Sequence, residues 1–201
     1  MSQEFATLNA RLATFADVDA IVSTLTSAFF RDPVWGPVFS DEHRAAHAAV
    51  MWRLYTTSAF RYPFTFVTPN VEAAALWIPP GGTELTAAEE ASVEELLTST
   101  AGADSARAIM TIYEQLDAEH PAEPCFYLSL LGVHDDHRGA GVGMALLADS
   151  LARIDALGAA AYLESTNPAN NARYESVGFR KRGQIVMGSG HVVTTMWRAG
   201  R

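Results

Sequence analysis

The sequence contains little cysteine, and it lacks both a long apolar run and a recognisable targeting signal. Its single cysteine, Cys125, excludes an intrachain disulfide and cannot supply a cysteine-based zinc site, which fits a reducing compartment. No segment approaches the roughly 20 consecutive apolar residues of a membrane span, and residues 1–5 carry no basic patch followed by an apolar stretch. We therefore expect a cytoplasmic protein with no membrane association and no metal site.

Positive charge is also scarce. The 201 residues include 14 Lys and Arg against 23 Asp and Glu, which gives a formal net charge of −9. Because nucleic-acid binding needs a clustered basic face, this balance argues against a nucleic-acid partner and requires any phosphate site to be local. Apolar residues make up 49% of the chain, enough for a full core, so we expect a single domain spanning residues 1–201.

Apolar spacing and turn residues predict a mixed α/β fold, with one sheet layer and helices on both faces. Thr86 and Glu89 have the spacing of a capping box at the start of a helix, and Ser40 and Ser105 are candidate N-caps of two others. Short β-branched or aromatic runs predict strands at residues 10–14, 64–68, 73–78, 126–133, 159–164, 184–187 and 191–197, the last two as a hairpin.

The most informative segment follows the strand at 126–133, which is apolar enough to be buried on both faces. A polar connector leads from it into Arg138-Gly-Ala-Gly-Val-Gly143, and Met144 begins the next helical pattern. Free N–H groups in a first helical turn point outward, and the helix dipole adds positive charge there. Gly139, Gly141 and Gly143 allow a ligand to approach the backbone, and Arg138 offers a bidentate donor. The segment therefore predicts a phosphate site.

Two phosphate-bearing ligands fit such a loop. A dinucleotide fold has Gly-x-Gly-x-x-Gly after a strand and an acidic residue about 20 positions on, a place that Glu164 occupies at the end of the next predicted strand. The glycines here, however, are spaced Gly-x-Gly-x-Gly, five residues separate Val133 from Gly139, and no further strand–helix–strand series is visible. A nicotinamide-dependent oxidoreductase is therefore the weaker alternative.

The pattern Val133-x4-Arg138-x-x-Gly141-x-Gly143 resembles the acetyl-coenzyme A signature of the GNAT N-acetyltransferase superfamily, Gln/Arg-x-x-Gly-x-Gly/Ala. The later pattern Asn170-x-x-x-Tyr174-x-x-x-Gly178-Phe179 resembles its second signature. The resemblance implies a mostly antiparallel sheet with one splayed parallel strand pair and helices on both faces. Residues 121–133, 136–138 and 163–164 look most like puromycin N-acetyltransferase-like members.

The resemblance also implies which residues bind acetyl-CoA as co-substrate. The strand backbone at Leu131, Gly132 and Val133 would pair with the pantetheine arm. The pyrophosphate would lie on the loop and the first turn of the helix, which comprise Arg138, Gly139, Ala140, Gly141, Val142, Gly143 and Met144. Asn170, Asn171 and Arg173 would reach the far end of the cofactor.

Three residues are candidates for the chemistry. The tyrosine of the second signature, Tyr174, would donate a proton to the leaving thiolate, since a phenol with pKa near 10 can act as general acid. An amine acceptor arrives protonated and needs a base. Glu164 is the leading candidate because it ends a strand next to the expected wedge, and His120 is the second.

The acceptor side is less specific in the sequence. Large aromatic side chains, among them Trp35 and Trp77, lie where the family walls its substrate pocket, although such residues are as often part of the core. We expect an acetyl-CoA-dependent N-acetyltransferase for a small amine, an antibiotic or other amine metabolite, that works by direct transfer. A non-catalytic acyl-CoA-binding or sensing module is the alternative on the same fold. A homodimer through the terminal hairpin is also expected from the resemblance.

Overall fold

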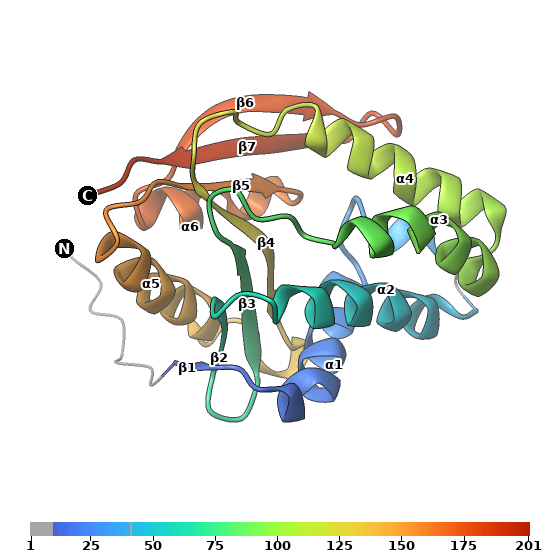
Figure 1. Ribbon diagram of the computed structural model, residues 1–201, viewed down its shortest axis with the longest axis horizontal. Helices are drawn as coiled ribbons and strands as arrows, with labels where there is room; N and C mark the ends of the chain where they lie inside the picture. Colours follow the sequence, from blue (N-terminus) through green and yellow to red (C-terminus); the bar gives the residue numbers. More distant parts are fainter. Residues whose placement is uncertain (1–9, 41) are drawn as a thin grey trace.

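The computed structural model describes residues 10–40 and 42–201, so residues 1–5, examined above for a targeting signal, lie outside the described part. Seven strands form one sheet in the order β1-β2-β3-β4-β5-β7-β6 (Figure 1). The strands are β1 (Arg11–Leu12), β2 (Thr65–Val67), β3 (Ala73–Ile78), β4 (Phe126–Val133), β5 (Ala161–Ser165), β6 (Arg180–Val186) and β7 (Val192–Arg198). All neighbouring strands run antiparallel except β4 and β5, which run parallel.

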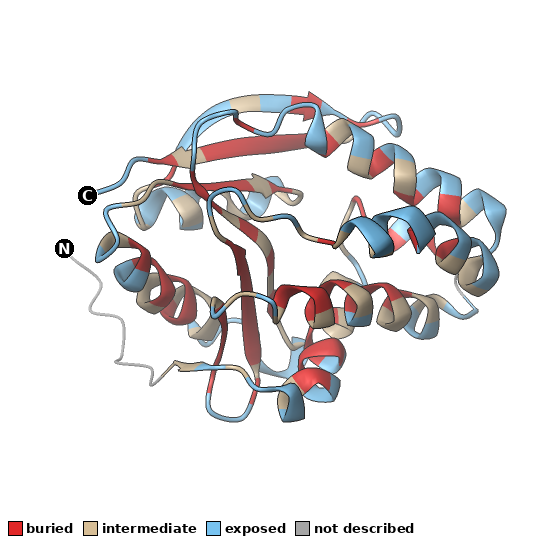
Figure 2. Ribbon diagram, viewed as in Figure 1, coloured by how far each residue is buried: buried red, intermediate tan, exposed pale blue. Residues whose placement is uncertain are grey.

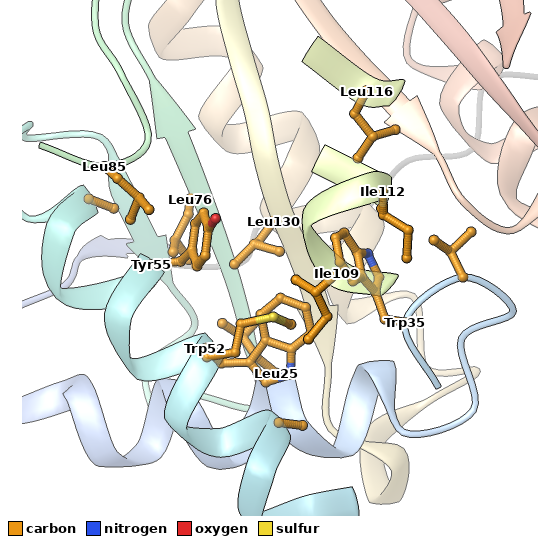
Figure 3. Packing of buried hydrophobic residues seen from close by; sticks show 14 of the residues in the cluster. Leu25, Trp35, Trp52, Tyr55, Leu76, Leu85, Ile109, Ile112, Leu116 and Leu130 are labelled. Atoms are coloured by element: carbon orange, nitrogen blue, oxygen red, sulfur yellow. The ribbon is translucent and has the colours of Figure 1, made fainter. Parts of the chain in front are cut away.

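Helices cover both faces of the sheet, so the predicted fold class is confirmed. The α-helices are α1 (Val18–Phe29), α2 (Arg44–Ala59), α3 (Ala87–Ala101), α4 (Ala103–Asp117), α5 (Val142–Asp155) and α6 (Asn171–Ser176). Helices α1 to α4 share one apolar core, of which Leu25, Trp52 and Ile109 are fully buried members (Figure 3). Helix α5 and the segment that contains α6 pack on a second core across the sheet. Within the described residues, no helix has the length and apolar character needed to cross a membrane.

The parallel pair separates soon after it forms. Strands β4 and β5 pair only at Phe126–Ala161 and Tyr127–Tyr162, and beyond these residues they diverge. On its other side, β4 stays paired with β3, but the register shifts because Leu76 pairs with Leu130 and Trp77 with Leu128. Ser129 is therefore the extra residue of a β-bulge, which bends a strand and redirects a side chain. The divergence leaves an open wedge in the middle of the sheet.

Burial along β4 differs from the prediction. The strand alternates between buried and half-buried residues instead of being buried on both faces, because β5 diverges from it and leaves part of the strand uncovered (Figure 2). Helix α5 starts at Val142 and not at Met144, since Gly141 takes a left-handed conformation that begins the helix two residues earlier. The sequence pattern thus predicted the positions of the strand, the loop and the helix. The wedge itself forms because β5 diverges from β4.

Two of the predicted helix caps are wrong and one is confirmed. Helix α2 begins at Arg44 with His43 in the N-cap position, so Ser40 does not cap it. Helix α4 begins at Ala103 because Gly102, with φ 88°, ends one helix and starts the next, which leaves Ser105 inside the first turn. The capping box of Thr86 and Glu89 is present as predicted. The terminal hairpin is also present, although β6 begins at Arg180, earlier than expected.

Candidate active site

A cleft of about 700 Å³ fills the wedge between β4 and β5. One end is formed by the glycine loop, residues 138–143, and the first turn of α5. The other end, here called the acceptor side, is lined by Trp35, Ser129 and Glu164. Residues 128–131 and Val133 of β4 line the wall between the two ends, so the cleft uses the part of β4 that β5 leaves unpaired.

The glycine loop is open toward this cleft. Gly139 and Gly141 have φ angles of 83° and 77°, a region that side chains with a Cβ rarely enter. A Cβ placed on either residue would meet no protein atom within 4 Å, so the protein leaves the space beside the loop free. Gly141 is also the N-cap of α5, whose first N–H groups and dipole favour an anion there. The loop therefore fits the diphosphate of a nucleotide cofactor.

Gly143 and Gly132 serve packing more than ligand access. A Cβ on Gly143 would lie 2.5 Å from Val133 Cγ2, so the absence of a side chain lets α5 approach β4 closely. A Cβ on Gly132 would meet the side chains of Leu25 and Ala28 at 2.9 and 3.0 Å, because this glycine faces α1. Gly143 still lines the cleft, whereas Gly132 does not. Gly132 could therefore pair with a ligand only through its N–H and C=O groups at the strand edge.

Arg138 lines the cleft but already has protein partners. Its Nη2 donates to the carbonyl oxygen of Ala28 at 2.6 Å, and its Nε lies 2.7 Å from Asp135 Oδ1. The backbone N–H of Asp135 in turn donates to Ser27 Oγ at 3.0 Å. Arg138 therefore fixes the glycine loop to the end of α1. Its guanidinium retains N–H groups that no described protein atom accepts, and these remain able to reach a phosphate.

The remaining predicted cofactor residues divide into two groups. Val142, Met144, Asn170 and Arg173 line the cleft, and Arg173 Nη1 donates to Asn170 Oδ1 at 2.9 Å. The side chain of Asn171 is turned instead toward β7, where Nδ2 donates to Thr194 Oγ1 at 3.1 Å.

Ala140 is exposed on the glycine loop. Ala140 and Asn171 remain predicted cofactor residues because they lie within the two sequence motifs. Neither of them lines the cleft, which is formed by their neighbours.

Tyr174 lies on α6 at the edge of the cleft, where it packs against the second core. Burial, reinforced by the negative charge of Asp32, raises the pKa of its phenol to about 12. The hydroxyl therefore stays protonated at neutral pH. A phenol held in this state can donate a proton but cannot act as a base.

Glu164 faces the cleft from β5. Burial raises the pKa of its carboxyl group to about 8, although the hydroxyls of Tyr127 and Tyr162 offset part of this effect. Its Oε1 is buried and has no hydrogen-bond partner among the described residues. Such a carboxylate is a stronger base than a solvated one, and its pKa is close to the working pH of a general base.

His120 lies outside the set of residues that line the cleft. Its ring packs edge-on against Tyr127 and Tyr162, with centroid distances of 4.9 and 5.1 Å. Burial lowers its pKa, against the opposing charge of Asp117. The histidine therefore approaches Glu164 only through the two tyrosine rings, and the geometry favours Glu164 as the base.

Two polar pairs at the site were not found from the sequence. Ser129 Oγ donates to Glu84 Oε1, joining the bulge of β4 to the loop before α3. Thr166 Oγ1 donates to Asp32 Oδ2 at 2.6 Å, joining the end of β5 to the loop after α1. Ser129 stands out in the sequence as the serine within the run Phe-Tyr-Leu-Ser-Leu-Leu. Its partner Glu84 could not be predicted, because it lies 45 positions away in the sequence.

Cys125 is buried next to β4, and burial raises the pKa of its thiol to about 11. It is therefore a packing residue and a poor nucleophile. In the described part of the chain, no three His, Cys, Asp or Glu side chains converge in a way that could hold a metal ion.

A mostly antiparallel sheet, opened at one parallel pair beside a free helix N-terminus, is the architecture of an acetyltransferase. A model of the acetyltransferase (GNAT) domain matches residues 86–198, and the chain belongs to this family. Family members use acetyl-CoA, and the open glycine loop fits that ligand.

Solved structures agree with this assignment. A Corynebacterium glutamicum protein described as histone acetyltransferase HPA2 and related acetyltransferase is 25% identical, with a TM-score of 0.73 over 98% of both chains. Arylalkylamine N-acetyltransferase 2 from Aedes aegypti has a TM-score of 0.65 at 13% identity, over 98% of this chain and 100% of its own. A chain of the NatC complex bound to Gag peptide and CoA has a TM-score of 0.57 at 12% identity, with the same coverage. The latter two show similarity of fold alone.

Proposed function

We propose that the protein is an acetyl-CoA-dependent N-acetyltransferase that transfers the acetyl group directly to the amine of a small molecule, with both substrates bound at once. The observation that carries this proposal is the cleft itself. It joins an open glycine loop, suited to a diphosphate, to the carboxylate of Glu164 at the acceptor side, whose buried Oε1 has no hydrogen-bond partner among the described residues. Tyr174 lines the same cleft as a protonated phenol.

The chain's own residues divide the work of binding between them. The N–H groups at residues 139–143 and the guanidinium of Arg138 would hold the diphosphate, and the unpaired edge of β4 at residues 131–133 would align the pantetheine arm. Asn170, Asn171 and Arg173 would contact the rest of the cofactor. When bound, acetyl-CoA supplies an acetyl thioester whose sulfur leaves as a thiol.

Proton transfers at two residues of the protein complete the reaction. Glu164 takes a proton from the acceptor ammonium, which frees the nitrogen lone pair to form the bond to the acetyl carbon. As the carbon–sulfur bond breaks, Tyr174 donates its phenolic proton to the sulfur. Tyr174 recovers a proton from the acylated nitrogen, and Glu164 releases its own to solvent. The net reaction gives an amide, a free thiol and one proton.

Direct transfer is favoured because the only cysteine is buried and its thiol pKa is raised. A covalent acyl carrier needs an activated, accessible nucleophile.

The acceptor class is part of the same proposal. Structural neighbours include proteins named arylalkylamine N-acetyltransferase and agmatine N-acetyltransferase, which supports a small amine. The resemblance to puromycin N-acetyltransferase-like members adds amine-bearing antibiotics to the compounds worth testing. We further propose a single domain over residues 1–201, a cytoplasmic location, and a homodimer formed through β6, which is an edge strand of the sheet.

The test is an amine and antibiotic panel with acetyl-CoA, read by release of free thiol. Acetylated product from at least one amine is expected. Tight cofactor binding without thiol release from any amine would instead indicate a non-catalytic acyl-CoA-binding module.

Stabilisation against heat by NAD(P)H but not by acetyl-CoA would favour the oxidoreductase. A ligand at a hundred times its dissociation constant adds about 2.7 kcal/mol, which is readily measured.

A further inference from the structure

The Glu84–Ser129 pair forms a second polar position on the acceptor side of the cleft. Ser129 lines the cleft at the bulge of β4 and donates to the carboxylate of Glu84. Glu84 lies in the loop between β3 and α3 and is only half-buried by its neighbours. Even so, burial raises the pKa of its carboxyl group to about 7. Ser129 lines the cleft and Glu84 does not, so the carboxylate of Glu84 lies directly behind the Ser129 hydroxyl.

The sheet register brings this pair level with Glu164. Tyr127 of β4 pairs with Tyr162 of β5, and Ser129 and Glu164 each follow two residues later along their parallel strands. The two residues therefore lie across the wedge from each other. The charge of Glu84 also contributes to raising the pKa of Glu164, as expected of two carboxyl groups that share one space.

Neither carboxylate has a positive partner within the described part of the chain. Among the residues that the structure describes, every ion pair involves other acids, and no Lys, Arg or His contributes to the pKa of Glu84 or Glu164. Burying carboxylates without counter-charge is costly, so a charge supplied by the ligand would be strongly favoured. Glu164 Oε1 in addition has no hydrogen-bond partner and lies in the lining of the cleft.

An aromatic wall stands beside the two acids. Trp35, which lines the cleft, has its ring 5.3 Å from that of Tyr113, and Tyr113 stacks on Tyr55 at 5.3 Å. The charge of Glu84 contributes to raising the pKa of both tyrosines, so both lie close to it. Figure 3 shows Trp35 and Tyr55 in the same buried cluster as Leu130 of β4. Aromatic faces stabilise an alkyl chain that ends in a cation.

We infer that the acceptor is a linear diamine, with one nitrogen placed at Glu164 for acetylation and the second, cationic nitrogen held by Glu84 and Ser129. This inference rests on the proposed function and specifies its substrate class. The gap between the two acids exceeds the ~4.8 Å that separates paired strands, so several methylene groups must connect the nitrogens. The alkyl chain would lie along Trp35, the member of this aromatic group that lines the cleft.

The experiment compares α,ω-diamines, from diaminoethane to diaminohexane, with n-alkylamines of equal chain length, using the full protein and acetyl-CoA. We expect the KM of the best diamine to be roughly tenfold or more below that of the matching monoamine, the effect of one charged hydrogen bond. Glu84→Gln should remove most of this difference, so that the KM of the diamine rises toward the KM of the monoamine measured with the same variant. Glu94→Gln, on the exposed face of α3, is the matched control and should change neither.

Equal KM values for diamines and monoamines would overturn the inference, as would a diamine preference that survives Glu84→Gln. If Glu84→Gln does not fold, Ser129→Ala and Glu84→Asp make the same comparison, and each should weaken the diamine preference.

If no amine is acetylated, the proposed function fails. The inference that the cleft binds a diamine is then tested by measuring amine binding directly. The CoA-loaded protein should then bind diaminobutane, but not n-butylamine, with a change in tryptophan fluorescence from Trp35. Equal responses to the two amines would refute it.

Discussion

Replacing Glu164 by glutamine tests whether this carboxyl group is both buried and functional. Burial raises its pKa from 4.5 to about 8, so the folded state binds this proton more tightly than the unfolded chain does. The ionised group therefore destabilises the fold. The penalty is absent below the unfolded pKa of 4.5, grows as pH rises, and is complete above about 8. At about 1.36 kcal/mol per pKa unit, the full penalty is roughly 5 kcal/mol.

Glu164→Gln keeps the shape and removes the titration. Relative to wild type, the variant should gain about 3 kcal/mol in free energy of unfolding between pH 5.5 and pH 9, since part of the penalty is already present at pH 5.5. Urea denaturation at the two pH values measures this difference, with Glu94→Gln as the exposed control. A stability difference that is the same at both pH values would refute the assignment of a raised pKa to Glu164.

The same variant should lose activity. Loss of a general base lowers kcat/KM by roughly 10²- to 10⁴-fold. In wild type, kcat/KM should rise with pH up to about 8 as Glu164 ionises. Trifluoroethylamine, a weakly basic amine, arrives unprotonated and should be affected less by the substitution than an ordinary alkylamine. Equal losses with both amines would remove Glu164 from the proton transfer, and His120→Ala would then be the next variant to test.

Four further substitutions test the remaining parts of the site. Tyr174→Phe should lower kcat by roughly 10²-fold or more and leave cofactor affinity nearly unchanged, which rapid-quench kinetics with a fast acceptor can check. Arg138→Ala should weaken CoA binding, measured by calorimetry, with little loss of kcat at saturation. Gly141→Ala introduces left-handed strain of about 1–2 kcal/mol and should reduce CoA affinity. Gly102→Ala, at another positive-φ glycine outside the cleft, is also strained but should leave CoA affinity unchanged. Cys125→Ala should keep kcat within about twofold, because no acyl-cysteine forms; a large loss would revive a covalent route.

Much of the fold could be predicted because its signals are local. The glycines after β4, the apolar face of α5 and the capping box at Thr86 each depend on residues close together in the sequence. The cofactor end of the cleft follows from this, since a strand, a loop and a helix N-terminus are consecutive. The cap predicted at Ser105 failed because the positive φ of Gly102 allowed a sharper turn between α3 and α4 than the side-chain pattern suggested.

The acceptor side could not be predicted in the same way. Thr166 and Asp32 lie 134 positions apart and meet only because the loop after α1 packs against the end of β5. The bulge at Ser129 depends on a register shift against β3, which no local pattern in β4 reveals. Burial of Glu164, and hence its basicity, likewise depends on helices and strands from distant parts of the chain.

The most direct test of the central claim is a crystal structure of the protein with CoA. The account predicts that the diphosphate lies against the backbone N–H groups of residues 139–143, at the start of α5, and that the pantetheine arm follows β4 toward Glu164. A diphosphate bound elsewhere, with the space beside Gly139 and Gly141 closed by protein side chains, would contradict it.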